Sequence, residues 1–175
     1  RIAYAVIRYG GYRNVSPYQY GNINILDASP QIENCAIGNS SASGVLVSSS
    51  SMVASHPTLT GNTFTGNETA AISIDPSSLL ALSGNSADGN GTNGVDIRSG
   101  TITSSVTWDQ TDLPYRLVGT VTVDQGDTLT IGLDMVFKGN YSQRLVIAGK
   151  LLVNGAAGQE VYFTSYRDDS IGGDT

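Results

Sequence analysis

Short apolar segments alternate with polar residues along the chain, and this pattern repeats. Residues 30–48 align without a gap on residues 57–75, at an offset of 27. Residues 59–75 in turn align without a gap on residues 82–98, at an offset of 23. Each copy holds two or three short stretches of alternating apolar and polar residues, a pattern typical of half-buried β-strands. The repeat therefore predicts strands and no helix.

Four sets of apolar residues occupy equivalent positions in the three copies. These sets are Ile32, Leu59 and Leu82; Ile37, Phe64 and Ala87; Val45, Ile72 and Val95; and Val47, Ile74 and Ile97. A unit this short without a helix cannot bury its own apolar face, whereas units stacked about 4.8 Å apart bury a continuous core. The sequence therefore predicts an all-β fold, a parallel β-helix of about six or seven coils.

Asparagine recurs between the apolar positions, and the first copy has a cysteine and a serine there instead. The two sets are Cys35, Asn62 and Asn85, and Ser40, Asn67 and Asn90. Stacked asparagines can link their side-chain amides from coil to coil, which satisfies polar groups whose burial otherwise costs free energy. We predict two structural ladders of these residues, with Cys35 as a small buried thiol that ends or interrupts one of them.

Two copies of the repeat read SPQIENCAIGNSSASGVLV and PTLTGNTFTGNETAAISI. They resemble the coil repeat of the right-handed parallel β-helix, or pectin-lyase-like, superfamily of bacterial secreted proteins. The downstream stretches VTVDQGDTLTIGLDMVFKGN and LVIAGKLLVNGAAGQEVYFTS resemble the opening coils of such a domain. That superfamily includes lyases, hydrolases, epimerases, adhesins and passive stalks, so the resemblance implies a right-handed fold and leaves the activity open.

The same resemblance implies a division of the chain. Residues 1–107 correspond to late coils of one unit and residues 120–175 to opening coils of a further unit, with one continuous solenoid as the alternative. Residues 108–119 form the predicted junction, where Trp108 and Pro114 interrupt the coil rhythm.

Composition and charge limit the classes of molecule that we expect this chain to bind. Serine, threonine, glycine and asparagine make up 40% of the chain, and charged residues only 14%. The net charge is −6 and the few basic residues are scattered, which argues against nucleic acid as a partner. No apolar run approaches the roughly 18 residues of a membrane span, so we expect no membrane insertion. The low charge and many hydroxyls favour an extracellular or cell-surface location.

Asp75 and Arg98 are the main candidates for chemistry. They follow the inward strands of adjacent copies, so stacking places them beside each other and beside Ser48. An exposed pair of this kind contributes roughly 0–1 kcal/mol to stability. In β-helix lyases acidic residues hold calcium and an arginine or lysine acts as a base, so the resemblance implies ligand binding here. The structural ion pair is the favoured interpretation and a ligand site the alternative.

A second candidate is a glycine-containing loop with three carboxylates, Asp168, Asp169 and Asp174. Such a loop could begin a calcium site, although calcium takes six to eight oxygen ligands. The alternative is a solvated loop. Calcium is the one ion the sequence suggests, and we expect no other cofactor.

Tyrosines cluster near the beginning of the chain, with arginines between them. The candidate ligand-binding residues are Tyr9, Tyr12, Tyr18 and Tyr20, near Arg8 and Arg13. Aromatic side chains stack on sugars and also build protein interfaces. Packing of a loop against the flank of the solenoid is the alternative.

The favoured function is a non-catalytic extracellular β-helix repeat that acts as a stalk or adhesive surface. The alternative is a module that binds or cleaves polysaccharide, in the manner of a lyase. The expected partners are a polysaccharide or neighbouring copies of the chain that stack on open ends of the solenoid, where strand edges are unpaired.

Overall fold

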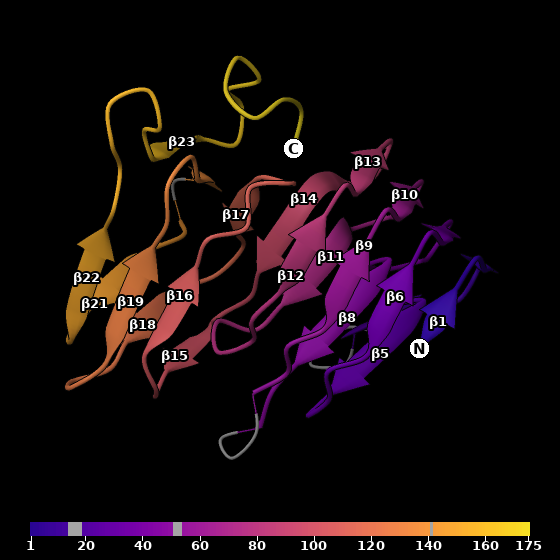
Figure 1. Cartoon of the computed structure of the whole chain (residues 1–175), viewed down its shortest axis with the longest axis horizontal. Helices are drawn as coiled ribbons and strands as arrows, with labels where there is room; N and C mark the ends of the chain where they lie inside the picture. The colour runs from indigo at the N-terminus through magenta and orange to yellow at the C-terminus, as the bar shows by residue number, and fades with distance from the viewer. Residues whose placement is uncertain (14–18, 51–53, 141) are drawn as a thin grey trace.

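The computed structural model describes residues 1–13, 19–50, 54–140 and 142–175. Within these ranges the chain forms short β-strands and no α-helix, so no helix there could span a membrane. The strands stack side by side into coils along the long axis of the molecule (Figure 1). The predicted all-β parallel solenoid is confirmed.

One sheet, which we call the long sheet, contains a strand from every coil. Its strands, in order, are β5 (Ile23–Leu26), β8 (Val45–Ser48), β11 (Ala70–Ile74), β14 (Thr92–Ile97), β17 (Tyr115–Leu117), β20 (Val136–Gly139) and β23 (Tyr162–Ser165). Neighbouring strands in it are all parallel. This sheet gives the solenoid one continuous wall.

Two other sheets complete the first four coils. The first contains β1 (Ile2–Ala3), β6 (Gln31–Glu33), β9 (Thr58–Thr60) and β12 (Ala81–Ser83). The second contains β2 (Val6–Arg8), β7 (Ala36–Gly38), β10 (Thr63–Thr65) and β13 (Ser86–Asp88). A small antiparallel hairpin, β3 (Tyr12–Arg13) with β4 (Gln19–Tyr20), leaves the first coil.

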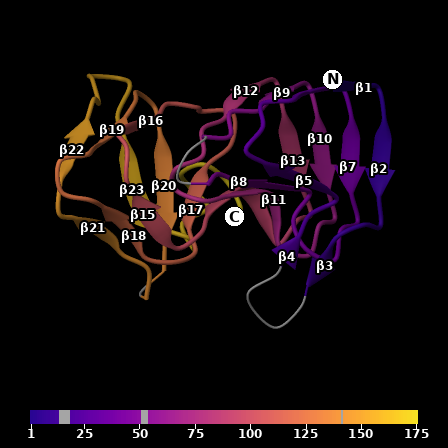
Figure 2. The same ribbon diagram turned by 90° about the horizontal axis from the view of Figure 1, so that it is seen from below.

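The later coils use two different sheets. One contains β15 (Gly100–Ile102), β18 (Val121–Val123) and β21 (Leu145–Ile147), and the other β16 (Val106–Trp108), β19 (Thr128–Ile131) and β22 (Lys150–Val153). Figure 2 shows the two groups of sheets side by side along the axis. The sheets around the core thus change between β14 and β15, while the long sheet continues.

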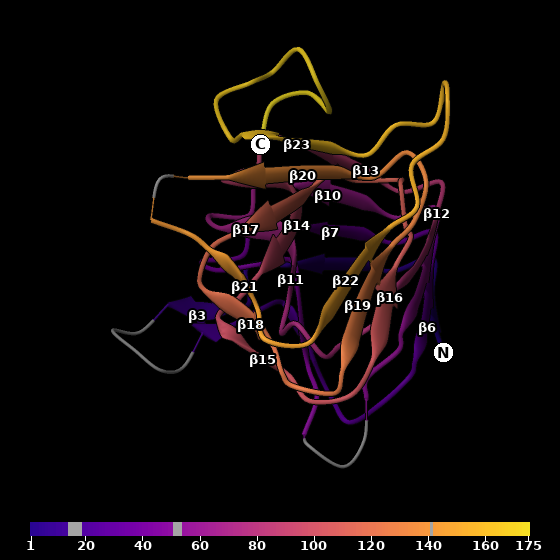
Figure 3. The ribbon, with the colours of Figure 1, turned by 90° about the vertical axis from the view of Figure 1, so that its left-hand side faces the viewer.

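The core consists of inward-facing columns in the predicted register. Ile32 pairs with Leu59 and Leu59 with Leu82, and the other three predicted sets pair in the same way. Most of these side chains are fully buried, and β-branched residues dominate because they suit a crowded strand surface. The end-on view in Figure 3 shows the sheets enclosing this core.

The predicted junction, residues 108–119, covers the last of the early coils. The backbone N–H of Leu82 donates to Oε1 of Gln110 at 2.7 Å, and that of Asn85 donates to Oδ2 of Asp112 at 2.9 Å. Side chains from the junction therefore bond to β12 and to the corner between β12 and β13, where no further strand follows. Whether the chain consists of two units stays a prediction.

Aromatic residues fill the core of the later coils. Trp108 lies 5.8 Å from Phe137 and 6.3 Å from Tyr115 between ring centroids, and Phe137 stacks on Phe163 at 5.4 Å. These rings join β16 to three strands of the long sheet. They pack the region in which the sheets change.

Candidate functional site

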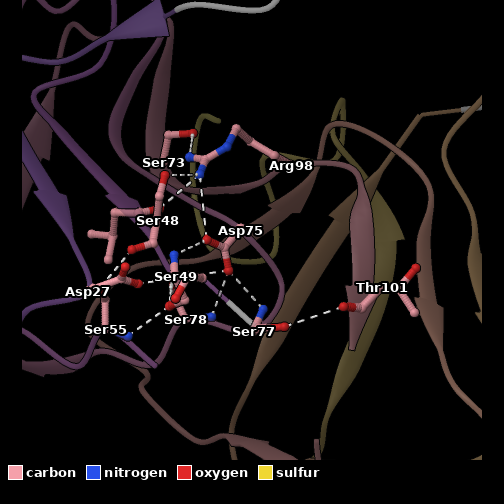
Figure 4. A network of polar contacts seen from close by, with 12 residues as sticks. Asp27, Ser48, Ser49, Ser55, Ser73, Asp75, Ser77, Ser78, Arg98 and Thr101 are labelled. Atoms are coloured by element: carbon pink, nitrogen blue, oxygen red, sulfur yellow. Dashed lines mark hydrogen bonds and ion pairs between the residues drawn. The ribbon is translucent and has the colours of Figure 1, made fainter. Parts of the chain in front are cut away.

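Asp75 and Arg98 lie beside each other at one margin of the long sheet. Asp75 follows β11 and Arg98 follows β14, so the parallel register stacks them at the same level. The Arg98 guanidinium is 3.9 Å from the Asp75 carboxylate and donates to the Ser48 hydroxyl at 2.9 Å (Figure 4). The structure thus brings together the residues that the repeat alignment placed side by side.

The Asp75 carboxylate is bonded chiefly to its own turn. Oδ1 accepts from the backbone N–H groups of Ser77 at 3.0 Å and Ser78 at 2.9 Å, and from the Ser78 hydroxyl at 3.1 Å. Oδ2 accepts from the backbone N–H of Ser49 at 2.5 Å. These bonds shape the turn after β11 and link it to the previous coil, as aspartate commonly does in turns.

The Arg98 guanidinium is also bonded to the chain itself. It donates to the carbonyl of Val47 at 2.8 Å and to the hydroxyl of Ser73 at 3.1 Å. Burial lowers the pKa of Arg98, and the nearby Asp75 carboxylate opposes this shift. Because its donors are engaged across β8 and β11, Arg98 clamps three strands of the long sheet.

A groove of about 570 Å³ lies next to this pair. Hydroxyl-bearing residues dominate its lining, among them Ser49, Ser77, Ser99, Thr101 and Thr103, and Asp75 contributes the one carboxylate. The groove reaches from the turns after β8 and β11 to β15, where Ser77 Oγ donates to the carbonyl of Thr101 at 3.3 Å. The groove has both polar and apolar lining, and its hydroxyl groups are suited to hydrogen bonds with a hydroxylated ligand.

A second ion pair lies on the outward face of the long sheet and was missed by the sequence analysis. Arg116 binds Asp96 through two parallel hydrogen bonds, from Nε at 2.9 Å and from a terminal nitrogen at 3.0 Å. The Asp96 side chain is only 8% exposed. Burial raises its pKa, and Arg116 opposes the rise. The sequence gives one sign of this pair: Asp96 is a charged residue between two apolar strand residues, Val95 and Ile97.

The loop proposed for calcium holds a cation of the protein itself. Lys138, on β20, is only 1% exposed, and its ammonium donates to the carbonyls of Asp168 at 2.9 Å and Gly173. The Asp168 carboxylate accepts from the hydroxyls of Thr164 and Ser170, and these bonds lower its pKa. Figure 3 shows this loop outside β20 and β23.

Calcium binding by the three carboxylates of that loop stays a prediction. Among the described residues no group of three or more histidine, cysteine, aspartate or glutamate side chains is placed to hold a metal ion. Asp169 and Asp174 do not join Asp168, whose oxygens are engaged within the loop. The Lys138 ammonium occupies the carbonyls of Asp168 and Gly173, and oxygen atoms of this kind are the ligands that calcium takes.

The first asparagine ladder crosses the interior at the corner between the two early sheets. Oδ1 of Asn62 accepts from the backbone N–H of Cys35 at 3.0 Å, and Oδ1 of Asn85 accepts from both the backbone and the side-chain nitrogens of Asn62, each at 3.0 Å. Asp112 accepts the same two bonds from Asn85. Cys35 begins this series; it is 2% exposed, and its thiol contacts the carbonyl of Glu33 at 3.2 Å.

The second ladder has the same form. Oδ1 of Asn67 accepts from the backbone N–H of Ser40 at 3.1 Å, and Oδ1 of Asn90 accepts from the Asn67 side chain at 2.7 Å. Asn93 accepts from Asn90 at its end. Ser40 has no side-chain amide to continue the ladder. The Asn22 side chain lies nearby instead and donates to the carbonyl of Gly38 at 2.8 Å.

Each ladder position follows a residue with a positive φ angle. The first corner has Tyr4, Asn34, Gly61 and Gly84, and the second has Tyr9, Asn39, Gly66 and Gly89, with φ between 51° and 66°. Glycine and asparagine adopt this conformation readily, whereas other L-residues lose about 1–2 kcal/mol. Only the first coil, formed by β1, β2 and β5, places tyrosines there.

The tyrosines proposed as ligand-binding residues lie on the first coil and its hairpin. Tyr9 is 80% exposed, and Tyr12 and Tyr20 are cross-strand partners in the hairpin, 56% and 46% exposed. Tyr18 lies outside the described residues. The sequence analysis left out Tyr4, which is 79% exposed and equivalent to Asn34. These residues lie apart from the Asp75 and Arg98 pair, which follows β11 and β14.

Comparison with known proteins adds the family. A family model described as "Right handed beta helix region" matches residues 12–158, which is most of the chain. Searches of curated proteins and of solved structures gave no match. The match agrees with the stacked parallel strands, the interior columns and the asparagine ladders. The chain therefore belongs to the right-handed β-helix family.

Proposed function

We propose that this chain is a non-catalytic structural β-helix, exposed outside the cell as a stalk or an adhesive surface. The observation that carries this proposal is that its candidate catalytic side chains bond to the chain itself. Asp75 shapes a turn, Arg98 clamps strands, and Asp96 and Arg116 neutralise each other. A general base or a metal ligand needs a group that is available to a substrate.

Two further properties support an extracellular role. On the third coil the side chains that face outward from the early sheets are all threonine: Thr58, Thr60, Thr63 and Thr65. The chain is acidic, and only 14% of its residues are charged. Such a surface resists non-specific association, and a solenoid transmits its register rigidly from coil to coil.

Arg98→Ala tests the structural role of the pair. Loss of the clamp should lower the free energy of unfolding by about 2 kcal/mol, because the Val47 carbonyl and two serine hydroxyls lose their donor. The chain should cleave no acidic polysaccharide before or after the change, measured as formation of unsaturated products. Cleavage by the unchanged chain that disappears in Arg98→Ala would overturn the proposal.

The location can be tested separately in cells that produce the protein. Protease added to intact cells should digest the stalk region, or the region should be recovered from the medium. Protection until the cells are lysed would contradict an extracellular location.

Polysaccharide binding without cleavage is a second candidate, favoured by the groove beside Asp75. Its hydroxyl lining matches the hydrogen-bonding capacity of a sugar, and its volume falls within the range of ligand pockets. A glycan array with the unchanged chain should then show binding that Thr101→Val weakens. Thr63→Val, on the exposed face of β10, is the matched control and should leave binding unchanged. Equal loss in both variants, or no binding, would exclude the groove.

A further inference from the structure

The first coil and its hairpin expose aromatic and basic residues, two of which are strained. We call these residues together the tyrosine face: Tyr4, Val6, Arg8, Tyr9, Tyr12 and Tyr20. Tyr4 and Tyr9 are at the two ends of β2, and Val6, which lies between them, is 68% exposed. In the next three coils the residues equivalent to Val6 are Ala36, Thr63 and Ser86, so in this sheet a large apolar side chain is exposed at this position only in the first coil.

The fold itself does not require these tyrosines. At the equivalent corners, the other early coils use asparagine or glycine, which adopt the same φ at little cost. Tyrosine at a positive φ is a backbone outlier, and it gains no burial here because about four fifths of each side chain is exposed. Strained and exposed residues that the fold does not need point to a partner outside the chain.

Charge indicates what that partner is. Residues 1–26 contain three arginines and no acidic residue, whereas all 15 acidic residues follow, and one of these, Glu33, pairs with Arg1. Arg8 is exposed and has no acidic partner among the residues that the structure describes. The later coils carry the exposed aspartates Asp109, Asp124 and Asp134, which form no ion pair within the described part of the chain. The first coil thus carries a basic and aromatic surface, and residues 100–175 are acidic on balance, with nine acidic and five basic residues.

We propose that the tyrosine face binds the acidic later coils of a second copy of this chain. Opposite charges orient the two copies, and the tyrosines provide rigid contact area at low entropic cost. The two surfaces differ, so the contact is heterologous and each copy retains one unused surface of each kind. Copies would join head to tail into longer rods, which goes beyond the proposed role of a single chain as a stalk.

Sedimentation velocity measures the association. The unchanged chain should associate as its concentration rises, and added NaCl should weaken the association because it screens the charges. Tyr4→Gly with Tyr9→Gly should weaken it about tenfold or more, as expected for central aromatic contacts. The same variant should melt at a higher temperature, because glycine relieves both strained corners. Asn34→Gly with Asn39→Gly is the matched control one coil away and should leave association unchanged.

A mixing experiment tests the head-to-tail geometry. The variant Tyr4→Gly with Tyr9→Gly lacks the two central tyrosines of the tyrosine face but keeps the acidic coils. The variant Asp109→Asn, Asp124→Asn and Asp134→Asn lacks the acidic surface but keeps the tyrosine face. Each alone should be monomeric, and the mixture should form a 1:1 complex that grows no longer.

Several results would overturn the proposal. These are a chain that stays monomeric at all accessible concentrations, association that survives the tyrosine variant, and a mixture that forms no complex. A monomeric chain that binds polygalacturonate through the same tyrosines would assign the face to an acidic polysaccharide instead.

Discussion

At the scale of single residues, the interior polar side chains decide the stability of the coil corners. Asn62 is 1% exposed and serves the N–H of Cys35, the carbonyl of Ile32 and the amide of Asn85. No water can replace these bonds in a packed interior. A buried polar group that loses its partner costs about 1–3 kcal/mol.

Asn62→Ala should therefore lower the free energy of unfolding by about 3 kcal/mol, since it leaves several buried groups without partners. Asn85→Ala should cost less, because Asn85 is half-buried at the end of the same ladder and solvent can reach the groups it leaves. Urea unfolding of the two variants measures the difference. Equal losses of stability in Asn62→Ala and Asn85→Ala would contradict this, because the buried amide would then stabilise the fold no more than the half-buried one.

The buried pair of Asp96 and Arg116 gives a pH dependence. The pKa of Asp96 is raised from its ordinary value of 3.8, so its ionisation favours the unfolded chain. This group contributes stability that is fully present below pH 3.8 and lost as pH rises through its folded pKa. Removal of Arg116 should raise that pKa further.

Arg116→Met should consequently cost about 3 kcal/mol at neutral pH, and the loss should shrink in acid as Asp96 takes up a proton. Adding Asp96→Ser should restore most of the stability, because Ser73 occupies the equivalent place on β11. Thermal melts of both variants between pH 3 and pH 7 test this. A loss in Arg116→Met that does not change with pH would contradict the assignment.

At the scale of elements, the ladder corners between strands follow a local rule that can be read directly from the sequence. A residue that tolerates a positive φ comes first and a ladder residue follows, as in Gly61-Asn62, Gly66-Asn67, Gly84-Asn85 and Gly89-Asn90. The first residue turns the chain and the second fastens the turn to the next coil. Each three-residue strand between two corners is then held at both ends.

Gly89 provides a clean test of the turning residue, since nothing lies within 4 Å of the place where a side-chain Cβ would stand. Gly89→Ala should lower the free energy of unfolding by about 1–2 kcal/mol through backbone strain alone. Gly89→Asn should be nearly neutral, because Asn39 adopts the same φ in another coil. The difference in urea midpoint between the two variants measures the strain.

The sequence predicted the repeated elements well and the irregular contacts poorly. The alignment placed Ile72 over Val45, and Asn85 after Asn62, because equivalent residues in a solenoid must stack. The partners at the ladder ends, Asp112 and Asn93, have no equivalent in the other copies, so no offset could reveal them. Arg116 also lies in the junction, where the repeat is interrupted.

The contacts of the loop above Lys138 could not be predicted from the sequence either. Its three aspartates suggested calcium because carboxylates are visible in a sequence, whereas backbone carbonyls are not. The ammonium that occupies the loop comes from a strand about thirty residues earlier, and only the parallel pairing of β20 with β23 brings it there. The Asp75 and Arg98 pair was foreseeable, but the number of bonds that engage each group was not.

At the scale of the whole molecule, the long sheet and the aromatic core join two groups of coils that otherwise share no sheet. β14 pairs with β17 across the change of sheets, and Tyr115 on β17 is fully buried against Trp108. This continuity favours one cooperative unit over two separate ones.

Unfolding should therefore occur in one transition. Trp108 is the single tryptophan, so its fluorescence reports the junction, while far-UV circular dichroism reports all strands. The two signals should coincide in urea, as two-state behaviour requires. Tyr115→Ala should cost about 3–5 kcal/mol and separate the two curves, because it loosens the joint. Separate transitions in the unchanged chain would show that the joint is already weak.

The asparagine ladders also bear on how such a protein can change its length during evolution. Every inner amide accepts from the preceding coil and donates both to that coil and to the following one, so each coil presents the same interface to its neighbours. Deletion of residues 62–84 would place Asn85 directly after Gly61, where Asn62 now stands, and Asp112 would still end the series. Loss or duplication of a whole coil would therefore leave the ladder bonds satisfied. A change of a few residues would also leave them satisfied where it falls in the connection between coils, as the offsets of 27 and 23 show, but not where it falls between the two ladder corners of one coil.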